Sequence, residues 1–343
     1  MLKISYLQHI FVRIMELLDR RRIASLLPMQ ECISVMERMF LSLASGDCLQ
    51  PLRSLIWLPD RSGLLGMMPG YANGPGDPNT PDSTRSAGVL GIKVITIFHG
   101  NGALGLPSHQ GVVMLFDATN GTPLLLLDAA EITAIRTAAA SAVATRLLAR
   151  PDASRLTILG TGEQAERHIE SISLVRSLTR VTIWGRSESH AATLARRLET
   201  LYPIPFDVAP TARDAVKHAD IVCTVTASPS PVLLGDWLPA GVHINAVGSC
   251  TPSTRELDTA AVLRCRLYTD RYESLFREAG EFLIPRSEGL IAESDVKGEI
   301  GELLAGTVTG RCHPDDLTLF KSLGIAAEDL FSAKHILDKL PYI

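Results

Sequence analysis

A glycine-containing turn constrains the fold of this chain more than any other feature. Residues 156–165 read LTILGTGEQA, a short apolar run followed at once by the pattern G-x-G-x-x-A. The apolar run predicts a buried strand, and the residues after the turn predict a helix. Gly160 permits the tight turn, Gly162 lets a pyrophosphate approach the backbone, and the small Ala165 lets helix and strand pack closely. Because a helix N-terminus presents unpaired N–H groups to phosphates, the pattern predicts a dinucleotide site.

The chain around this turn alternates between short apolar runs and helical segments. Strands are predicted at residues 156–159, 181–184, 207–208, 221–226 and 243–247. Helices are predicted from the glycine turn to about residue 177, at 190–198 and at 211–218. This alternation predicts a parallel sheet with crossover helices, the doubly wound α/β architecture. The candidate cofactor-binding residues are Gly160, Thr161, Gly162, Glu163, Gln164, Arg186, Ser187, Thr226 and Val247.

The end of the second strand of such a sheet usually distinguishes NAD from NADP. An acidic residue there binds the ribose hydroxyls of NAD, whereas a basic residue accommodates a 2′-phosphate. In this chain the strand ends in Trp184-Gly185-Arg186-Ser187, with no carboxylate at that position. Arg186 and Ser187 suit a 2′-phosphate, so NADPH is favoured. A solvated loop arginine is the alternative interpretation, and the nearby Glu188 keeps NADH possible.

The segments that flank this region have a different pattern. Residues 50–136 predict strands at 52–58, 63–68, 89–98 and 111–116, a Gly- and Pro-rich surface loop at 73–83, a hairpin at Asn120-Gly121, and a helix from Thr133 to about Leu148. Helices are also predicted after Met15, with Gly46 as C-cap, and at about 318–342, where the chain is expected to return to the N-terminal domain. Residues 1–14 fit no element, and we expect translation to start at Met15.

Composition excludes several functional classes. A chain of 343 residues suggests about two domains. With 33 Lys+Arg and 37 Asp+Glu the net charge is −4, which argues against a nucleic-acid partner. No apolar run is long enough to span a membrane. The six cysteines have no C-x-x-C spacing and no histidine cluster, so we expect no metal site and a reduced, cytoplasmic protein.

Short segments spread from about residue 22 to 335 form a specific set. They are GMMPGY (66–71), GIKVIT with Lys93, PSHQ (107–110), the NGT hairpin, AIRTAAASAVAT (134–145), LGTGEQA, IWGRS, INAVGS (244–249), REL (255–257) and TLFKSLGIAAEDL (318–330). Together they resemble the ornithine cyclodeaminase/mu-crystallin family. The resemblance implies a homodimer and a Rossmann domain, residues 137–318, inserted in an α+β dimerisation and substrate domain, residues 1–136 plus 319–343.

The resemblance also implies which residues bind substrate. The family's reactions act at a carbon next to a carboxylate, and its two arginines and one lysine fall on Arg53, Arg136 and Lys93. Lys93 would bind the carboxylate or donate a proton to an imine nitrogen. Without the resemblance, Arg53 is interpreted as an edge arginine on a strand, and Lys93 as a side chain that reaches the surface. His109 is a further candidate near the site, with a loop histidine hydrogen-bonded to the backbone as the alternative.

Two departures from the family pattern point to one branch of the family. Cyclodeaminases and archaeal-type alanine dehydrogenases carry an aspartate where this chain has Cys250, and ornithine cyclodeaminases carry a glutamate where it has Gly66. A thiol is no standing carboxylate base. We therefore predict NADPH-dependent reduction of a cyclic imino acid, Δ1-pyrroline-2-carboxylate or Δ1-piperideine-2-carboxylate, to L-proline or L-pipecolate. The alternatives are an NAD-dependent cyclodeaminase or amino-acid dehydrogenase, and a non-enzymatic NADPH- and ligand-binding protein.

Overall fold

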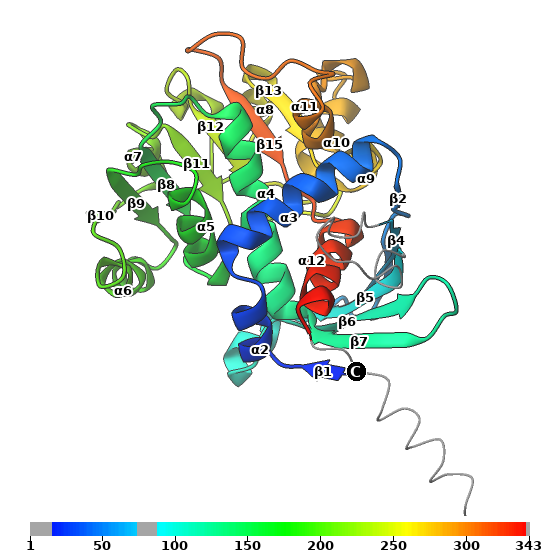
Figure 1. The fold of residues 1–343 in the computed structure, drawn as a ribbon. Coiled ribbons are helices and arrows are strands. Elements are labelled where there is room, and N and C mark those ends of the chain that lie inside the picture. The colour runs from blue at the N-terminus through cyan, green and yellow to red at the C-terminus, as the bar shows by residue number, and fades with distance from the viewer. Residues whose placement is uncertain (1–15, 74–87, 341–343) are drawn as a thin grey trace, which may run out of the picture. The chain divides into compact units, whose positions relative to one another are not determined.

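The structure, a computed structural model, describes residues 16–73 and 88–340 (Figure 1). The predictions for residues 1–14 and for nearly all of the 73–83 loop fall outside these residues. The chain divides into a first unit, Met1–Arg136 with Ile325–Ile343, and a second unit, Thr137–Gly324. Helix α4 (Ala129–Leu148) contains the first of these boundaries.

The second unit contains a parallel sheet, seen at the left and top of Figure 1. Its described strands are β8 (Arg155–Leu159), β9 (Arg180–Trp184), β10 (Phe206–Val208), β11 (Ile221–Thr224), β12 (His243–Ala246), β13 (Arg266–Thr269), β14 (Gly298–Glu299) and β15 (Thr318–Lys321). Their order is β10-β9-β8-β11-β12-β15-β13-β14, and every pair is parallel. The chain leaves β8 in one direction and returns for β11 on the other side, which confirms the predicted Rossmann-type sheet.

Helices connect these strands, and polar side chains mark where several of them begin. They are α5 (Glu163–Ser173), α6 (Glu188–Glu199), α7 (Ala212–Val216), α8 (Thr259–Arg264), α9 (Tyr272–Glu278), α10 (Gly280–Ser287) and α11 (Ile300–Leu304), with 3-10 turns at Gly235–Trp237 and Glu293–Asp295. Ser187, Thr211 and Asp258 cap α6, α7 and α8 by accepting a backbone N–H. Val222, Ile244 and Phe282 belong to a buried apolar core.

The first unit is built on a mainly antiparallel sheet. Its described strands are β1 (Glu16–Leu18), β2 (Cys48–Leu49), β3 (Ser54–Trp57), β4 (Leu64–Ala72), β5 (Val89–Ile97), β6 (His109–Asp117) and β7 (Pro123–Asp128), with a 3-10 turn at His99–Leu104. The order is β1-β7-β6-β5-β4-β2, with β3 added on β4, and the β1–β7 pair is parallel. β6 and β7 form the hairpin predicted at Asn120-Gly121, where Gly121 has a φ of 75°.

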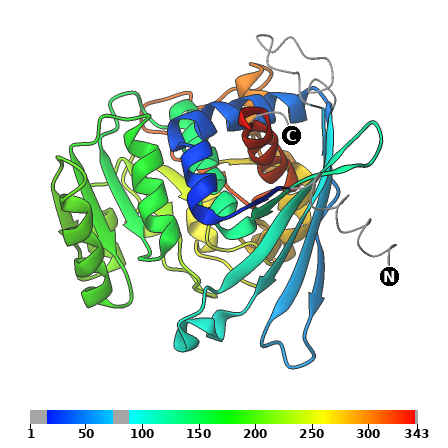
Figure 2. The same ribbon diagram turned by 60° about the horizontal axis from the view of Figure 1, so that its bottom comes forward.

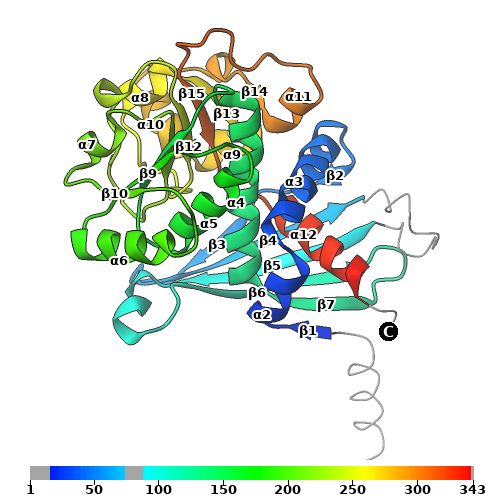
Figure 3. The ribbon, with the colours of Figure 1, turned by 60° about the vertical axis from the view of Figure 1, so that its left-hand side comes forward.

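Helices α2 (Arg20–Leu26), α3 (Met29–Ala44) and α12 (Ala326–Lys339) complete the first unit. One apolar face of α3 is buried, and Gly46, the predicted C-cap, follows its end with a left-handed φ of 81°. Helix α12 lies over one face of the sheet (Figures 2 and 3). A Cβ atom at Gly91 of β5 would lie 2.3 Å from the Leu330 side chain of this helix and 2.8 Å from the Met114 carbonyl oxygen of β6. Because the carbonyl belongs to the backbone and cannot move aside easily, this position requires glycine.

Two predictions about helix boundaries are wrong. Thr318 does not begin a helix: residues 318–321 form β15, which pairs with both β12 and β13, and the chain enters the first unit only at Ile325 instead of at residue 319. Thr133 does not cap α4 either, because the helix begins four residues earlier. There the Asp128 carboxylate accepts the Glu131 N–H at 2.8 Å.

Candidate active site

The glycine turn after β8 has the geometry that a pyrophosphate requires. Gly160 adopts a φ of 136°, and a Cβ atom there would lie 2.7 Å from the Val225 carbonyl oxygen. Gly162 caps α5, and a Cβ atom there would meet nothing within 4 Å. Ala165 is fully buried. The backbone at the start of α5 is therefore open to a phosphate group, and the residues present fit a dinucleotide.

The loop after β9 lies beside this turn. A Cβ atom at Gly185 would lie 2.6 Å from Cγ2 of Thr161, so the two loops are in direct contact. Arg186 is exposed, while Ser187 caps α6 by accepting the His190 N–H at 3.3 Å. Ser187 therefore has a local structural role, whether or not its hydroxyl also contacts a phosphate.

The remaining predicted cofactor residues follow the neighbouring strands. Thr226 lies two residues after the end of β11, and the Val247 N–H that follows β12 donates to the Thr224 carbonyl at 3.0 Å. Glu163 and Gln164 are the first two residues of α5. The structure thus brings all of these candidates to the carboxyl ends of β8, β9, β11 and β12, where ligands of open parallel sheets bind.

A buried cluster of charges lies in the first unit. Lys93, in the middle of β5, is 2% exposed. Its Nζ donates to Oγ1 of Thr133 at 2.6 Å and to Oδ1 and Oδ2 of Asp329 at 3.2 and 3.4 Å. Lys93 therefore points inward to α4 and α12 and does not reach the surface.

Arg136 of α4 joins the same cluster and is 3% exposed. Its Nε donates to Oδ1 of Asp329 at 3.2 Å, and its Nη1 donates to Oε2 of Glu328. Burial opposes the charge of this guanidinium, but Asp329 and Glu328 more than compensate and raise the pKa of Arg136. Arg136 is therefore a permanent cation.

The pKa of Lys93 is shifted in the opposite direction from that of Arg136. Burial, together with the positive charges of Arg136 and Arg53, lowers the pKa of Lys93 to about 8, although Asp329 opposes the shift. The ammonium group thus titrates close to neutral pH, which is the range useful for a proton donor.

Arg53 and His109 differ in their relation to this cluster. Arg53, half-buried, directly precedes β3, and its charge acts on Lys93. His109 begins β6, is exposed, and shares a 2.9 Å hydrogen bond with Ser108 through Nδ1. Val113, the β6 residue paired with Lys93, is four residues further along, a separation of roughly 13 Å. The structure therefore brings Arg53, Lys93 and Arg136 together and leaves His109 apart from them.

Sequence reasoning missed the acids of this cluster. Glu328 and Asp329 are both 0% exposed, at the start of α12. A signal was available, because two adjacent carboxylates stand within the apolar run of residues 325–331, and buried carboxylates require cationic partners.

The two positions at which this chain departs from its family pattern are occupied as follows. Gly66 of β4 pairs with Ile95 of β5, which is two residues from Lys93. Gly66 and Lys93 therefore belong to the same face of the sheet. Cys250, in the loop after β12, is partly buried against the apolar core of the second unit.

Among residues 16–73 and 88–340 no group of His, Cys, Asp and Glu could hold a metal ion. Within the same residues no helix is both long and apolar enough to cross a membrane.

Comparisons with known proteins agree with this arrangement. The model of the ornithine cyclodeaminase/mu-crystallin family matches residues 14–341. Ketimine reductase mu-crystallin of Mus musculus is 36% identical over 293 residues, which cover 85% of this chain and 86% of the mouse protein. The structure of Thermococcus litoralis Δ1-pyrroline-2-carboxylate reductase in complex with NADH and L-proline has a TM-score of 0.88 and 34% identity, and the match covers 94% of this chain and 96% of that one.

A third comparison extends the range of activities among similar proteins. An archaeal alanine dehydrogenase dimer with bound NAD has a TM-score of 0.85 and 29% identity, with 94% of both chains covered. The family model covers nearly the whole chain, and the mouse relative exceeds 30% identity over most of it. This chain therefore belongs to the ornithine cyclodeaminase/mu-crystallin family.

Proposed function

We propose that this protein is an NADPH-dependent reductase of a cyclic imino acid, either Δ1-pyrroline-2-carboxylate or its six-membered homologue Δ1-piperideine-2-carboxylate. The product is L-proline or L-pipecolate. The observation that carries the proposal is the buried cluster of Lys93, Arg136 and Asp329, which provides a permanent cation beside a lysine that titrates near neutral pH. The reductase names of the mouse and Thermococcus relatives support the class of reaction.

The first unit would bind the substrate carboxylate. The hydrogen bonds found for Arg136 among the described residues use Nε and Nη1, so Nη2 is the part of the guanidinium that would meet a carboxylate. Asp329 and Glu328 fix the orientation of that fork, and Arg53 adds a further positive charge near Lys93. These residues would therefore bind and orient a small anion.

Lys93 would supply the proton. When bound, the reduced nicotinamide supplies a hydride to the imine carbon. The nitrogen then needs one proton, and the Lys93 ammonium can release it because the pKa of Lys93 is lowered to about 8. Asp329 and Thr133 hold the Nζ atom in place during this transfer. If Lys93→Ala left turnover intact, this role would be wrong.

Support for NADPH over NADH comes from the loop after β9. Arg186 is exposed in a loop that contacts the glycine turn, and residues 184–187 contain no carboxylate that would bind ribose hydroxyls. The Thermococcus structure contains NADH, so cofactor preference within the family requires a measurement on this chain. Cytoplasmic location stays a prediction from the sequence.

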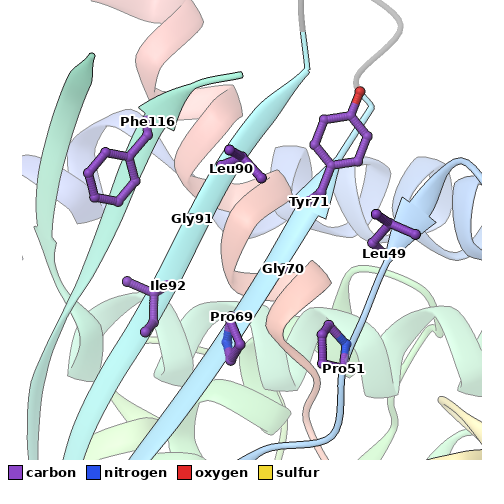
Figure 4. A pocket seen from close by; sticks show the side chains of 9 residues that line it. All are labelled: Leu49, Pro51, Pro69, Gly70, Tyr71, Leu90, Gly91, Ile92 and Phe116. Atoms are coloured by element: carbon purple, nitrogen blue, oxygen red, sulfur yellow. The ribbon is translucent and has the colours of Figure 1, made fainter. Parts of the chain in front are cut away.

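We also propose a homodimer that forms over the outer face of the first unit's sheet. Residues of β4 and β5 alternate between α12 and the opposite face, where an apolar hollow is lined by residues that include Pro69, Tyr71, Leu90 and Phe116 (Figure 4). Leu90 is 45% exposed and the neighbouring Leu49 is 66% exposed. Exposed apolar patches of this kind mark interfaces. The dimeric alanine dehydrogenase supports a second copy as the partner, and light scattering on the purified protein would test it.

The activity test measures loss of NADPH absorbance with each cyclic imine, with NADH in parallel. Ornithine or alanine with NAD serves as the contrast, with released ammonia as the readout. Rapid loss with an imine and no ammonia would support the reductase. Ammonia release without imine reduction would identify a cyclodeaminase or dehydrogenase. Tight NADPH binding with no turnover of any of these compounds would favour a binding protein.

A further inference from the structure

Glu256 is a fully buried carboxylate that neither the predicted cofactor site nor the substrate site includes. It follows β12 in the second unit, and its side chain accepts four hydrogen bonds. Oε1 accepts the N–H and the hydroxyl of Thr226, both at 2.7 Å. Oε2 accepts the hydroxyl of Thr224 at 2.7 Å and the N–H of Gly248 at 2.6 Å. The two oxygens are therefore hydrogen-bonded to the end of β11, to the loop after it and to the loop after β12.

These two loops carry predicted cofactor-binding residues. Thr226 is the second residue of the loop after β11, and Val247-Gly248 begins the loop after β12. The loops are also in direct contact, because a Cβ atom at Gly248 would lie 2.0 Å from the Thr226 carbonyl oxygen and 2.6 Å from Oε1 of Glu256. Glu256 thus joins the ends of two neighbouring strands at the edge of the sheet where a dinucleotide would bind.

A buried ion pair holds the second loop from its other side. Nζ of Lys321, on β15, donates to the carbonyl oxygens of Ala246 at 3.3 Å and Ser249 at 2.5 Å. It lies 3.4 Å from Oε2 of Glu281, whose Oε1 accepts the Glu256 N–H at 2.9 Å. The loop is therefore fixed both through its N–H groups and through its carbonyl groups.

We propose that Glu256 is a positioning residue for the nicotinamide cofactor, which acts by holding the Thr226 and Val247-Gly248 loops in the shape that receives it. This inference rests on the proposed cofactor site. A carboxylate is required because each of its oxygens faces one backbone N–H that cannot reverse its direction. An amide in the same place would turn its NH₂ group to either the Thr226 or the Gly248 N–H, and two donors would then face each other.

The test uses Glu256→Gln in the full-length protein, with fluorescence titration of NADPH and of NADH as the first readout. We expect a rise of about tenfold in the dissociation constant of the nucleotide that binds wild type. The glutamine NH₂ group would face either the Thr226 N–H, which loses its acceptor, or the Gly248 N–H, which keeps only the Thr224 carbonyl at 3.2 Å. The KM of the imino acid at saturating cofactor should stay unchanged, because the substrate cluster lies in the first unit. A purely structural residue would not produce this split.

Glu299→Gln is the matched control. Glu299 is also buried and also accepts a backbone N–H, from Tyr272 at 2.7 Å, but it lies on β14 at the far edge of the same sheet. This variant should bind nucleotide as wild type does. Equal nucleotide affinity in Glu256→Gln, Glu299→Gln and wild type would overturn the inference.

A milder variant covers the case in which Glu256→Gln does not fold. Thr224→Val removes one hydroxyl donor from Oε2 with little change in shape, and we expect a rise of about threefold to tenfold in the nucleotide dissociation constant. No rise would overturn the inference. If wild type binds nucleotide but reduces no imine, only the proposed substrate is wrong; if wild type binds neither nucleotide, the cofactor site and this inference both fail.

Discussion

Lys93 and Asp329 form a buried ion pair between β5 and α12, with Nζ 3.2 Å from Oδ1 and the two side chains 3% and 0% exposed. The same Oδ1 atom accepts the Arg136 Nε–H. Asp329 therefore connects the two cations of the candidate substrate site, and its charge opposes the lowering of the Lys93 pKa that burial causes.

The first prediction concerns pH. Lys93 faces Asp329, Thr133, Arg136 and Arg53, and the pKa of Lys93 is lowered to about 8. The imine kcat/KM should therefore fall as pH rises through about 8, because the proton donor is lost. Asp329→Asn removes the charge that supports the ammonium form, so the alkaline limb should move to lower pH. Asp338→Asn, at the C-terminal end of α12, where Asp338 is partly buried and pairs with Lys334, is the control. Identical limbs in all three proteins would contradict the assignment.

The second prediction concerns Arg136. Arg136→Met leaves Glu328 buried without this cation and should lower the free energy of unfolding by about 3–5 kcal/mol, measured in urea. Lys339→Met removes an exposed ion pair to Glu31 in the same unit and should change it by less than about 1 kcal/mol. Arg136→Lys keeps the charge but not the fork geometry, so the KM of the imino acid should rise. An unchanged KM in that variant would argue against carboxylate binding by Arg136.

The third prediction concerns cofactor choice. Arg186→Ser should raise the KM of NADPH by roughly 10- to 100-fold and leave the KM of NADH nearly unchanged, because a charge-assisted bond exists only with the 2′-phosphate. Arg213→Ser, an exposed arginine on α7, should change neither value. Equal effects on both cofactors would show that Arg186 does not recognise the phosphate.

The fourth prediction separates folding from binding at the glycine turn. Gly162→Ala meets open space, so the thermal midpoint should stay close to wild type while NADPH binding weakens where the new methyl group meets the pyrophosphate. Gly160→Ala adds strain at a φ of 136° and a contact of 2.7 Å with the Val225 carbonyl, so stability and binding should both fall. Wild-type affinity in folded Gly162→Ala would place the pyrophosphate elsewhere.

The parts of the fold that sequence could predict depend on local signals. The β8–turn–α5 segment is recognisable because an apolar run, two glycines and a small residue stand at fixed spacing. The prediction of a helix at residues 318–321 is wrong because a short apolar run is compatible with either a strand or a helix. They become a strand through parallel pairing with β12 and β13, which are more than 45 residues distant in sequence, and no local pattern records that pairing.

The residues of the candidate substrate site could not be identified from local sequence patterns either. Lys93 and Arg136 could be named only through the family resemblance, since one basic residue in a strand or helix does not reveal its partner. Asp329 binds both cations, and the chain places it 236 residues after Lys93. The prediction that Thr133 caps a helix is also wrong: Thr133 lies inside α4, and its hydroxyl accepts a hydrogen bond from Lys93. Tertiary contacts assign these roles, and composition or periodicity cannot.

The late position of α12 also has a consequence during synthesis on the ribosome. Lys93 and Arg136 are made long before Asp329 and Glu328, and the whole second unit is translated in between. At about 5–20 residues per second, the 236 residues from Lys93 to Asp329 take roughly 10–50 s. During that interval the nascent first unit holds its lysine and arginine without their acids, and its sheet lacks the helix that covers it. Translation of the first unit therefore starts before that of the second unit and ends after it. If a ribosome stalls directly before α12, the second unit is complete, but the sheet of the first unit stays uncovered.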